Sequence, residues 1–303
     1  MRFDVLILGS SSATPIYGRH PTAQLINVNE QLYLVDCGEG TQVQLIKYGV
    51  KSNRIKHIFI SHLHGDHYLG LIGLISSMHL VGRKDELHVY GPPGLKEIID
   101  LHFLHSQTEL RYLLHIHTTQ DKTNDVVFEN ENLQVSTFPL NHRIACTGFR
   151  FDEKKRLPAI HREKVAAIGV PTALLPSIKR GQDYTASDGT VHRWQTLTIA
   201  PQPPRSYAYC SDTVRTSGYL PYIQQVDLLY HEATFLHEML DRAVATYHTT
   251  ALQAAEIAAE VGAKKLLIGH YSARYKDLKP LLHESKAVFD ATQLALEGKW
   301  YPI

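Results

Sequence analysis

One short run of residues constrains this chain more than any other feature: Ser61-His62-Leu63-His64-Gly65-Asp66-His67. The apolar segment before it, His57–Ile60, predicts a strand, and the apolar residues of Tyr68–Leu80 recur at helical spacing. His62 and His64 alternate on an extended segment, so their side chains point to the same side. Asp66 and His67 come where the strand gives way to the helix. Four side chains that can bind a metal therefore gather at one strand end.

The residue types in this run favour a transition metal. Imidazole combined with carboxylate is a typical ligand set for zinc, and the same groups also accept manganese or iron. The spacing gives two ligand pairs that face slightly different directions, which suits two ions about 3.5–4 Å apart. A lone His-x-His would be better interpreted as surface histidines or a satisfied polar cluster. The strand before the run and the apolar helix after it favour the metal site.

Two ions need more ligands than this run supplies. Three candidates come after apolar runs that predict strands: His142 after 133–138, Asp212 after 207–210 and His270 after 265–268. Proteins of the α/β class usually place their sites at the carboxyl ends of strands. Taken singly, Asp212 could cap a helix and His142 could be a loop histidine. Together with the run they form a consistent ligand set, in which the two oxygens of Asp212 could bridge both ions.

Composition places the chain among ordinary globular proteins. It has 303 residues, of which 44% are apolar and 20% charged. No apolar run approaches the length of a membrane span, and the start of the chain lacks the features of a secretory signal. Three sparse cysteines argue against a disulfide framework, so we expect a cytoplasmic location and no membrane partner. The net charge of +1 neither requires nor excludes a nucleic-acid partner.

The pattern of apolar runs predicts a single α/β domain over residues 1–303, with two sheets and helices outside them. Further strands are expected at 4–8, 23–28, 31–35, 87–90, 147–151 and 227–230, and helices at 40–48, 96–105 and 249–261, the last capped by Thr249 or Thr250. The stretch Asp152–Arg193 differs, because it begins with a basic, polar run and then carries several Gly and Pro residues. We interpret it as an arm that protrudes from the domain, with a small helix and a hairpin-like end.

Several blocks along nearly the whole chain carry a resemblance to known proteins. The histidine run is similar to the signature of the metallo-β-lactamase superfamily, and the blocks together resemble ribonuclease Z, the endonuclease that trims the 3′ trailer from precursor tRNA. The blocks include Asp36-Cys37-Gly38-Glu39-Gly40-Thr41-Gln42 and His248-Thr249-Thr250, and the more specific ones are His231-Glu232-Ala233-Thr234 and His270-Tyr271-Ser272-Ala273-Arg274-Tyr275. The superfamily run alone would be compatible with many hydrolases.

The resemblance implies a fold, an assembly and a ligand set. The fold would be a four-layer αββα sandwich, commonly assembled as a homodimer. Two zinc ions would be bound, the first by His62, His64 and His142, the second by Asp66, His67 and His270, with Asp212 bridging them. The family's product pattern is a 3′-hydroxyl on the tRNA and a 5′-phosphate on the trailer.

The resemblance also assigns catalytic roles. Asp66 would accept the proton of the attacking water, and His248, supported by Glu232, would act as general acid near the leaving oxygen. A buried glutamate can hold an imidazole in its protonated form, so the pairing is chemically reasonable. The alternatives are a structural role in a loop for Glu232 and an N-terminal helix position without catalytic part for His248.

The arm departs from the resemblance at one point. Bacterial relatives grip the tRNA elbow with a Gly-Pro-rich segment, but the matching stretch here, Gly169–Pro176, lacks the Gly-Pro step after its first proline. Basic residues remain available for phosphates: Lys154, Lys155, Arg156, Arg162, Lys164, Lys179 and Arg180. A merely solvated surface explains these charges about equally well. If they bind RNA, specificity should come from tRNA shape and backbone contacts.

Two other functions remain open at the level of the sequence. The first is a two-metal phosphodiesterase or another hydrolase on the same scaffold, such as a thioester hydrolase or an arylsulfatase-like enzyme, acting on a small substrate. The second is a non-enzymatic scaffold that binds metal or RNA, which the complete ligand set disfavours. The expected function is that of a zinc-dependent endoribonuclease acting on precursor tRNA.

Overall fold

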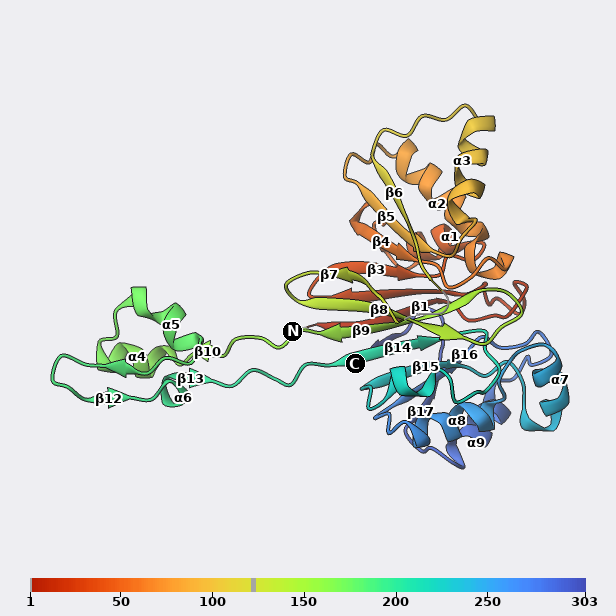
Figure 1. Ribbon diagram of the computed structural model, residues 1–303. Coiled ribbons are helices and arrows are strands. Elements are labelled where there is room, and N and C mark those ends of the chain that lie inside the picture. The colour runs from red at the N-terminus through yellow and green to blue at the C-terminus, as the bar shows by residue number, and fades with distance from the viewer. Residues whose placement is uncertain (1, 121–123) are drawn as a thin grey trace. The chain divides into compact units, whose positions relative to one another are not determined.

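The computed structural model describes residues 2–120 and 124–303, which form two compact units. The larger unit comprises residues 1–129, 135–151 and 205–303, and the smaller comprises 130–134 and 152–204. Figure 1 gives the order of their elements along the chain. None of the helices in the described ranges has both the length and the apolar character needed to span a membrane.

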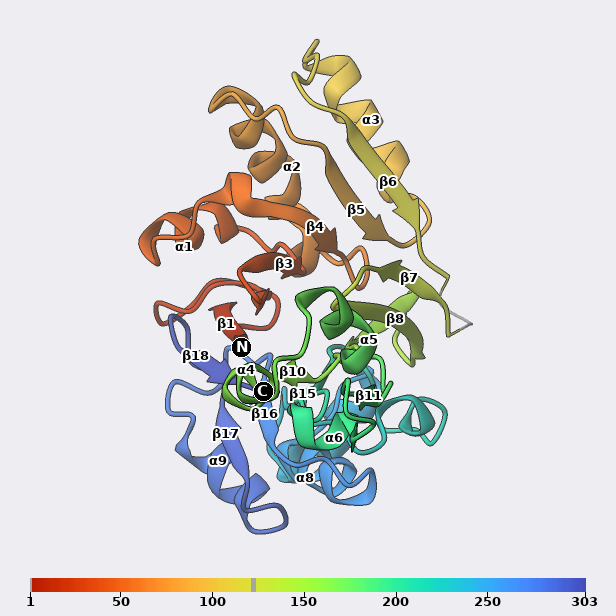
Figure 2. The same cartoon turned by 90° about the vertical axis from the view of Figure 1, so that its left-hand side faces the viewer.

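The first half of the larger unit builds a seven-stranded sheet with helices on one face. Its strand order is β18-β1-β2-β3-β4-β5-β6, and β3 to β6 run parallel (Figure 2). The strands are β1 (Phe3–Gly9), β2 (Ala23–Val28), β3 (Gln31–Val35), β4 (Ile55–Phe59), β5 (Leu87–Gly91), β6 (Leu114–Thr118) and β18 (Trp300–Pro302). Helices α1 (Thr41–Lys47), α2 (Gly65–Leu80) and α3 (Leu95–His105) bury their apolar sides against it in one core cluster.

The second half of the larger unit builds another seven-stranded sheet, in the order β17-β16-β15-β14-β9-β8-β7. The strands are β7 (Val126–Glu129), β8 (Leu133–Leu140), β9 (Cys146–Glu153), β14 (Ser206–Cys210), β15 (Leu228–Glu232), β16 (Leu266–Gly269) and β17 (Thr292–Leu294). Helices α8 (Ala251–Glu260) and α9 (Lys279–Lys286) pack on one of its faces, and α7 (Leu240–Ala245) precedes α8. Aligned parallel strands β14 to β17 place their carboxyl ends at one edge.

Aromatic side chains fill the layer between the two sheets. Phe59 of β4 lies 5.5 Å from both Phe149 and Phe151 of β9, measured between ring centroids. Tyr33 of β3 contacts Phe151 as well, and Phe151 contacts Tyr207 of β14. With helices on the outer face of each sheet, this layer completes the αββα sandwich that the sequence predicts (Figure 1).

Most predicted elements are confirmed, two of them to the residue. Strands Ala23–Val28 and Gln31–Val35 match their expected bounds. The predicted cap of the helix after His248 is Thr250, whose side chain accepts from the backbone N–H of Gln253 in a capping box. Strands β6, β7, β17 and β18 were not predicted, because they are only three to five residues long and β6 and β17 carry several polar side chains.

The smaller unit has a modest core of its own. Val165, Ile178 and Leu197 are buried there, with Trp194 and Tyr184 packed against them. Its elements are β10 (Ala159–Ile160), α4 (Arg162–Ile168), α5 (Leu175–Lys179), β11 (Tyr184–Thr185), β12 (Val191–His192), α6 (Trp194–Leu197) and β13 (Thr198–Ile199). Strands β11 and β12 pair antiparallel across a turn, which is the hairpin predicted for this stretch. The insertion leaves the larger unit after β9 and re-enters it at β14, two neighbouring strands.

Candidate active site

The strand ends of both sheets bring together all nine side chains that the sequence nominates. His62 and His64 come after β4, while Asp66 and His67 open α2. Asp212 comes after β14, Glu232 ends β15 and His270 comes after β16. His142 lies just after β8, and His248 lies between α7 and α8. The arrangement arises because parallel strands bring the residues beyond their carboxyl ends to one edge of the sheet.

Seven of these side chains form two adjoining groups that could each hold a metal ion. The first comprises His62, His64, His142 and Asp212, and the second Asp66, His67 and His270, with all ligand atoms of a group within 4.8 Å of one another. In the first group, His64 Nδ1 lies 3.1 Å from the Nε2 atoms of both His62 and His142. In the second, the Nε2 atoms of His67 and His270 lie 3.4 Å apart. This grouping is the one that the resemblance implies.

Asp212 lies between the two groups and faces each with a different oxygen. Its Oδ1 lies 3.1 Å from Nε2 of both His67 and His270. Its Oδ2 lies 3.7 Å from Nε2 of His62 and 3.8 Å from Nε2 of His142. The carboxylate is buried, so its geometry is fixed by the protein around it. This is the placement that a ligand bridging two ions requires.

The donor set fits divalent cations because its free lone pairs converge. Four of the histidines have a protein oxygen beside Nδ1. The pairs are His62 with Ser61 Oγ at 3.0 Å, His67 with Asp36 Oδ2 at 2.7 Å, His142 with the Tyr247 carbonyl at 3.1 Å, and His270 with Thr234 Oγ1 at 3.0 Å. With Nδ1–H as donor in each ring, the Nε2 lone pairs face one another and the oxygens of Asp212. Lone pairs that face each other repel unless a cation lies between them. Metal-binding histidines typically donate the N–H of their other ring nitrogen to a protein oxygen.

The electrostatics of the centre also favour the binding of metal ions. Burial lowers the pKa values of His62, His64 and His142, which keeps these imidazoles neutral and able to bind a metal. Burial alone would also lower the pKa of His67. The carboxylates of Asp212, Asp66 and Asp36 outweigh this effect and hold the pKa of His67 well above the ordinary value. The centre therefore attracts positive charge, either as protons or as metal ions that displace them.

Asp36 supports the centre although sequence reasoning gave it no role. The residue is buried directly after β3, and its carboxylate accepts from the backbone N–H and the hydroxyl of Ser61 at 2.7 and 2.8 Å. It also accepts from His67 Nδ1 at 2.7 Å and from the Tyr209 hydroxyl at 2.6 Å. Such carboxylate–histidine contacts fix the ring orientation and raise ligand basicity. Asp36 directly follows a strand that the sequence predicts, and this position could have nominated it as a site residue.

The backbone is strained at the same strand ends. Asp36, Asp212 and His270 adopt positive φ angles of 53°, 52° and 58°. Asp and His enter this region more readily than most residues, yet each instance costs on the order of 1–3 kcal/mol. Residues held this way cluster at functional sites, where surrounding structure enforces them.

A buried acid–base pair lies beside the metal-binding groups. The Nδ1–H of His248 donates to Oε1 of Glu232 at 2.9 Å, and Oε1 also accepts from the Thr213 amide at 2.8 Å. Burial lowers the pKa of His248, but the Glu232 carboxylate outweighs it and raises that pKa to about 9. Thr234, which sequence reasoning left without a role, donates its hydroxyl to Glu232 and contacts His270 Nδ1. His248 is therefore an imidazolium at neutral pH.

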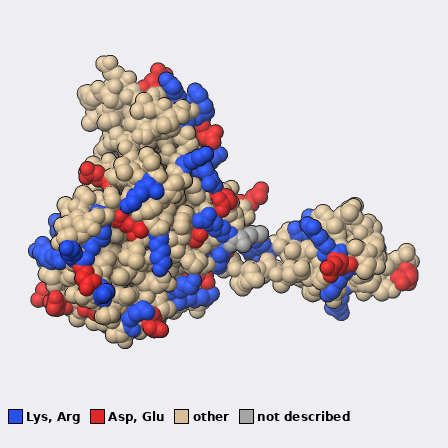
Figure 3. All heavy atoms as spheres, turned by 180° about the vertical axis from the view of Figure 1, so that it is seen from behind, with Lys and Arg blue, Asp and Glu red and all other residues tan. Residues whose placement is uncertain are grey.

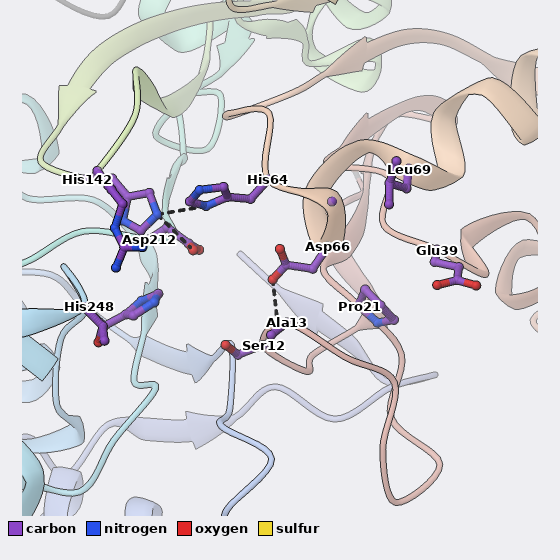
Figure 4. Close-up of a pocket in the computed structure, with 13 residues that line it drawn as sticks. Ser12, Ala13, Pro21, Glu39, His64, Asp66, Leu69, His142, Asp212 and His248 are labelled. Atoms are coloured by element: carbon purple, nitrogen blue, oxygen red, sulfur yellow. Dashed lines mark hydrogen bonds and ion pairs between the residues drawn. The ribbon is translucent and has the colours of Figure 1, made fainter. Parts of the chain in front are cut away.

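Five of the nine side chains line one cleft of about 450 Å³: His64, Asp66, His142, Asp212 and His248. Figure 4 shows His64, His142, Asp212 and His248 on one side of it and Asp66 on the other. The Oδ2 atom of Asp66 accepts from the backbone N–H of Ala13 at 2.8 Å, so the loop after β1 orients this carboxylate. Other lining residues are Ser12, Pro21, Glu39, Leu69, Arg143 and Thr246. Arg143 is the cationic side chain among them.

Comparison with known proteins identifies the family. A protein of Bacteroides fragilis named Ribonuclease Z is 47% identical over 297 residues, which cover 98% of this chain and 98% of that protein. The chain belongs to the ribonuclease Z family. The crystal structure of human tRNase Z, short form, covers 99% of both chains with a TM-score of 0.72 at 28% identity.

The chain also has the metallo-β-lactamase fold. The metallo-β-lactamase fold protein YhfI from Bacillus subtilis superimposes with a TM-score of 0.69 over 99% of this chain and 98% of that chain, at 19% identity. A family model described as Anti-Pycsar protein Apyc1 matches residues 3–159, about half of the chain, so the chain belongs to that family as well. That match spans the first sheet apart from β18, and β7 to β9 of the second.

Proposed function

We propose that the chain is a metal-dependent endoribonuclease that removes the 3′ trailer from precursor tRNA. The observation that carries the proposal is the 47% identity, over nearly its full length, to a protein named Ribonuclease Z. Support comes from the complete set of His and Asp side chains around one cleft. The products would be a tRNA with a 3′-hydroxyl and a trailer with a 5′-phosphate.

The metals of this proposal are two Zn²⁺ ions, for which manganese or iron could substitute. His62, His64 and His142 would hold the first ion, Asp66, His67 and His270 the second, and Asp212 both. When bound, such a pair stabilises charge on the phosphate oxygens and lowers the pKa of water. The imidazole and carboxylate donors described above fit this class of ion.

The chain's own residues would move the protons. Burial raises the pKa of Asp66, but neighbouring His67 and His270 outweigh it and keep the carboxylate ionised, as a proton acceptor for the attacking water must be. His248, protonated because of Glu232, would donate a proton from Nε2 to the departing 3′-oxygen. Water oxygen then joins phosphorus, the bond from phosphorus to the 3′-oxygen breaks, and the tRNA retains its hydroxyl.

Incubation with an end-labelled precursor tRNA and Zn²⁺ tests the proposal directly. A single cut just after the discriminator base, giving a 3′-hydroxyl and a 5′-phosphate, is the expected result. Cleavage at scattered sites, or turnover of small phosphodiesters without any cut in the precursor, would favour the small-substrate hydrolase instead.

The residues 152–193 form, in this proposal, the arm that binds the body of the tRNA. Over 152–204 the chain carries eight Lys or Arg and five Asp or Glu, so this part is more positive than the chain as a whole, whose net charge is +1. Arg162 and Lys164 lie on α4 and Lys179 on α5, whereas Arg156 pairs with Glu153 at 3.3 Å. On the face of the larger unit that Figure 3 shows, basic and acidic side chains are interspersed. Phosphate contacts from such residues confer affinity without base specificity.

Replacing residues 154–203 by a short Gly-Ser linker should separate binding of RNA from chemistry. The linker joins β9 to the neighbouring β14, so the larger unit keeps its own core. We expect kcat/KM for precursor tRNA to fall by roughly a hundredfold, about 2.7 kcal/mol, because several phosphate contacts are lost. Hydrolysis of bis(p-nitrophenyl) phosphate should stay within about twofold, since that substrate needs only the cleft. Equal loss of both activities, or of neither, contradicts an RNA-binding arm.

A homodimer is part of the proposal and has a candidate surface on the larger unit. Helices α1 and α2 leave apolar side chains exposed around a hollow of about 430 Å³. Ile46 is 78% exposed, Val81 66% and Val43 57%, and all three line that hollow. Contiguous apolar surface of this kind is typical of association sites, and a second copy of the chain is the occupant we propose.

The substitution Ile46→Glu tests the dimer. A carboxylate at the centre of an apolar contact should raise the dimer dissociation constant by roughly a hundredfold or more. Sedimentation velocity over a range of concentrations measures this constant. Leu104→Glu on α3 is the matched control, because Leu104 is 70% exposed and does not line the hollow. A wild-type chain that sediments as a monomer, or two variants that dissociate equally, contradicts this surface.

We place the reaction in the cytoplasm, where precursor tRNA would be met. Cys37, Cys146 and Cys210 are free and buried, as suits a reducing compartment.

A further inference from the structure

Histidines gather in a second place, on the face of the first sheet. His57, His88 and His115 lie on the neighbouring strands β4, β5 and β6 and are paired in register. Their rings stack, with centroids 5.2 Å apart for His57 and His88 and 4.7 Å apart for His88 and His115. His117, two residues further along β6, also stacks on His88 at 5.3 Å. Parallel strands in register thus align imidazoles in a row.

A carboxylate completes this row as a set of metal-binding groups. Glu86, which directly precedes β5, places Oε2 3.2 Å from His115 Nε2 and Oε1 3.8 Å from His88 Nε2. One ligand atom from each of the three residues lies within 4.8 Å of the others. Around a tetrahedral Zn²⁺ with bonds of about 2.0–2.1 Å, neighbouring ligand atoms lie roughly 3.3 Å apart. Small side-chain rotations would therefore bring all three atoms onto one ion.

Contacts behind the row fix which nitrogen faces the carboxylate. His88 Nδ1 lies 3.0 Å from His117 Nε2. With Nδ1–H donating to His117, the lone pair of His88 is on Nε2, which is the atom beside Glu86. A partner that orients a histidine in this way is typical of metal sites.

The cluster is open to solvent and separate from the catalytic cleft. The side chains of His88, His115 and Glu86 are 23%, 40% and 58% exposed, so an ion can reach them. Beneath them, His57 packs against Tyr33 and Phe128 in the layer between the sheets. None of these residues lines the cleft described above. The histidines lie on the strands themselves and Glu86 directly before β5, whereas the metal-binding residues of the cleft lie beyond the carboxyl ends of the strands.

We propose that Glu86, His88 and His115 bind one divalent transition-metal ion of the Zn²⁺ class, which joins β5 to β6. Imidazole with carboxylate selects such ions over Mg²⁺ or Ca²⁺, which prefer oxygen ligands alone. Among the described strands, β6 lies at one edge of its sheet and pairs with β5 alone. An ion shared by the two strands would hold this edge in place. The site needs neither the catalytic metals nor the proposed RNA substrate.

Counting bound Zn²⁺ tests the site. The full-length chain is stripped of metal and dialysed against micromolar free Zn²⁺, and bound metal is measured by mass spectrometry. We expect the wild type to hold one ion more than the double variant His88→Asn/His115→Asn. His105→Asn, at an exposed position on α3, is the matched control and should bind as many ions as the wild type. Precursor cleavage by the double variant should equal that of the wild type.

A spectroscopic measurement distinguishes this site from the cleft. Cu²⁺ added to the His64→Ala chain should give an electron paramagnetic resonance spectrum with one component from two imidazole nitrogens of this site, and His88→Asn/His115→Asn in that background should remove that component while the signal of the ligands left in the cleft remains. Equal Zn²⁺ counts in wild type and double variant overturn the proposal. Should the double variant fail to fold by circular dichroism, Glu86→Gln decides: unchanged Zn²⁺ affinity overturns the proposal, and weakened affinity supports it.

Discussion

Replacing His64 with alanine is expected to abolish precursor cleavage, with a loss of at least about 10³-fold in kcat, equivalent to roughly 4 kcal/mol of activation free energy. His64 Nδ1 lies 3.1 Å from the Nε2 atoms of both His62 and His142, so it belongs to the centre of the first group. Without it that group keeps two imidazoles and the shared Asp212 oxygen, and the Zn²⁺ affinity should collapse. The Lewis-acid contribution to the reaction is lost with the ion.

The measurement combines metal content with turnover. The variant should lose at least one Zn²⁺ relative to the wild type and should fail on both precursor tRNA and bis(p-nitrophenyl) phosphate, since both reactions use the centre. His64 is partly exposed at the cleft, so little packing is lost and the thermal midpoint without metal should be nearly unchanged. His105→Ala serves as the control for removing an exposed histidine. Turnover retained at the wild-type rate by a folded His64→Ala chain would disprove the assignment of this group.

The ligand set could be predicted from sequence because each ligand comes after an apolar strand. His142, Asp212 and His270 are far apart along the chain, yet each lies just beyond a run of buried residues. Strand ends of one sheet meet at one edge, so position along the strand predicts position in space, whichever strands are neighbours. The division of the ligands into two groups, by contrast, came from the resemblance.

The supporting contacts could not be predicted in the same way. Asp36 follows β3 of the first sheet and meets His67 of α2 and Tyr209 of β14 in the second sheet, and only the assembled sheets bring these side chains together. The row formed by His57, His88 and His115 depends on the register of three strands, and a shift by one residue would turn a side chain to the other face. Register is a property of tertiary packing, which apolar periodicity along one strand does not specify.

Replacing His248 with asparagine is expected to lower kcat for precursor tRNA by roughly 10²–10⁴-fold, the usual contribution of a general acid. The departing ribose 3′-oxygen is a strong base and needs a proton. A p-nitrophenolate leaving group is a weak base and does not, so hydrolysis of bis(p-nitrophenyl) phosphate should change by less than about tenfold. Asparagine occupies similar space and keeps a polar group beside Glu232. Equal losses on the two substrates would instead indicate that His248 only positions the substrate.

The pH dependence gives the same hypothesis a second, independent test. Glu232 raises the pKa of His248 to about 9, and the protonated form is the active one, so kcat for precursor tRNA should fall as the pH rises through about 9. In Glu232→Gln the carboxylate charge is lost while a hydrogen-bonding side chain remains, and burial then favours the neutral imidazole. The alkaline limb of that variant should therefore move to lower pH, and its deficit should be larger at pH 8 than at pH 6. With bis(p-nitrophenyl) phosphate the wild type and Glu232→Gln should show parallel pH profiles, because this substrate needs no proton donor. If the alkaline limb for precursor tRNA stays at the same pH in Glu232→Gln, the pairing of Glu232 with the general acid His248 is contradicted.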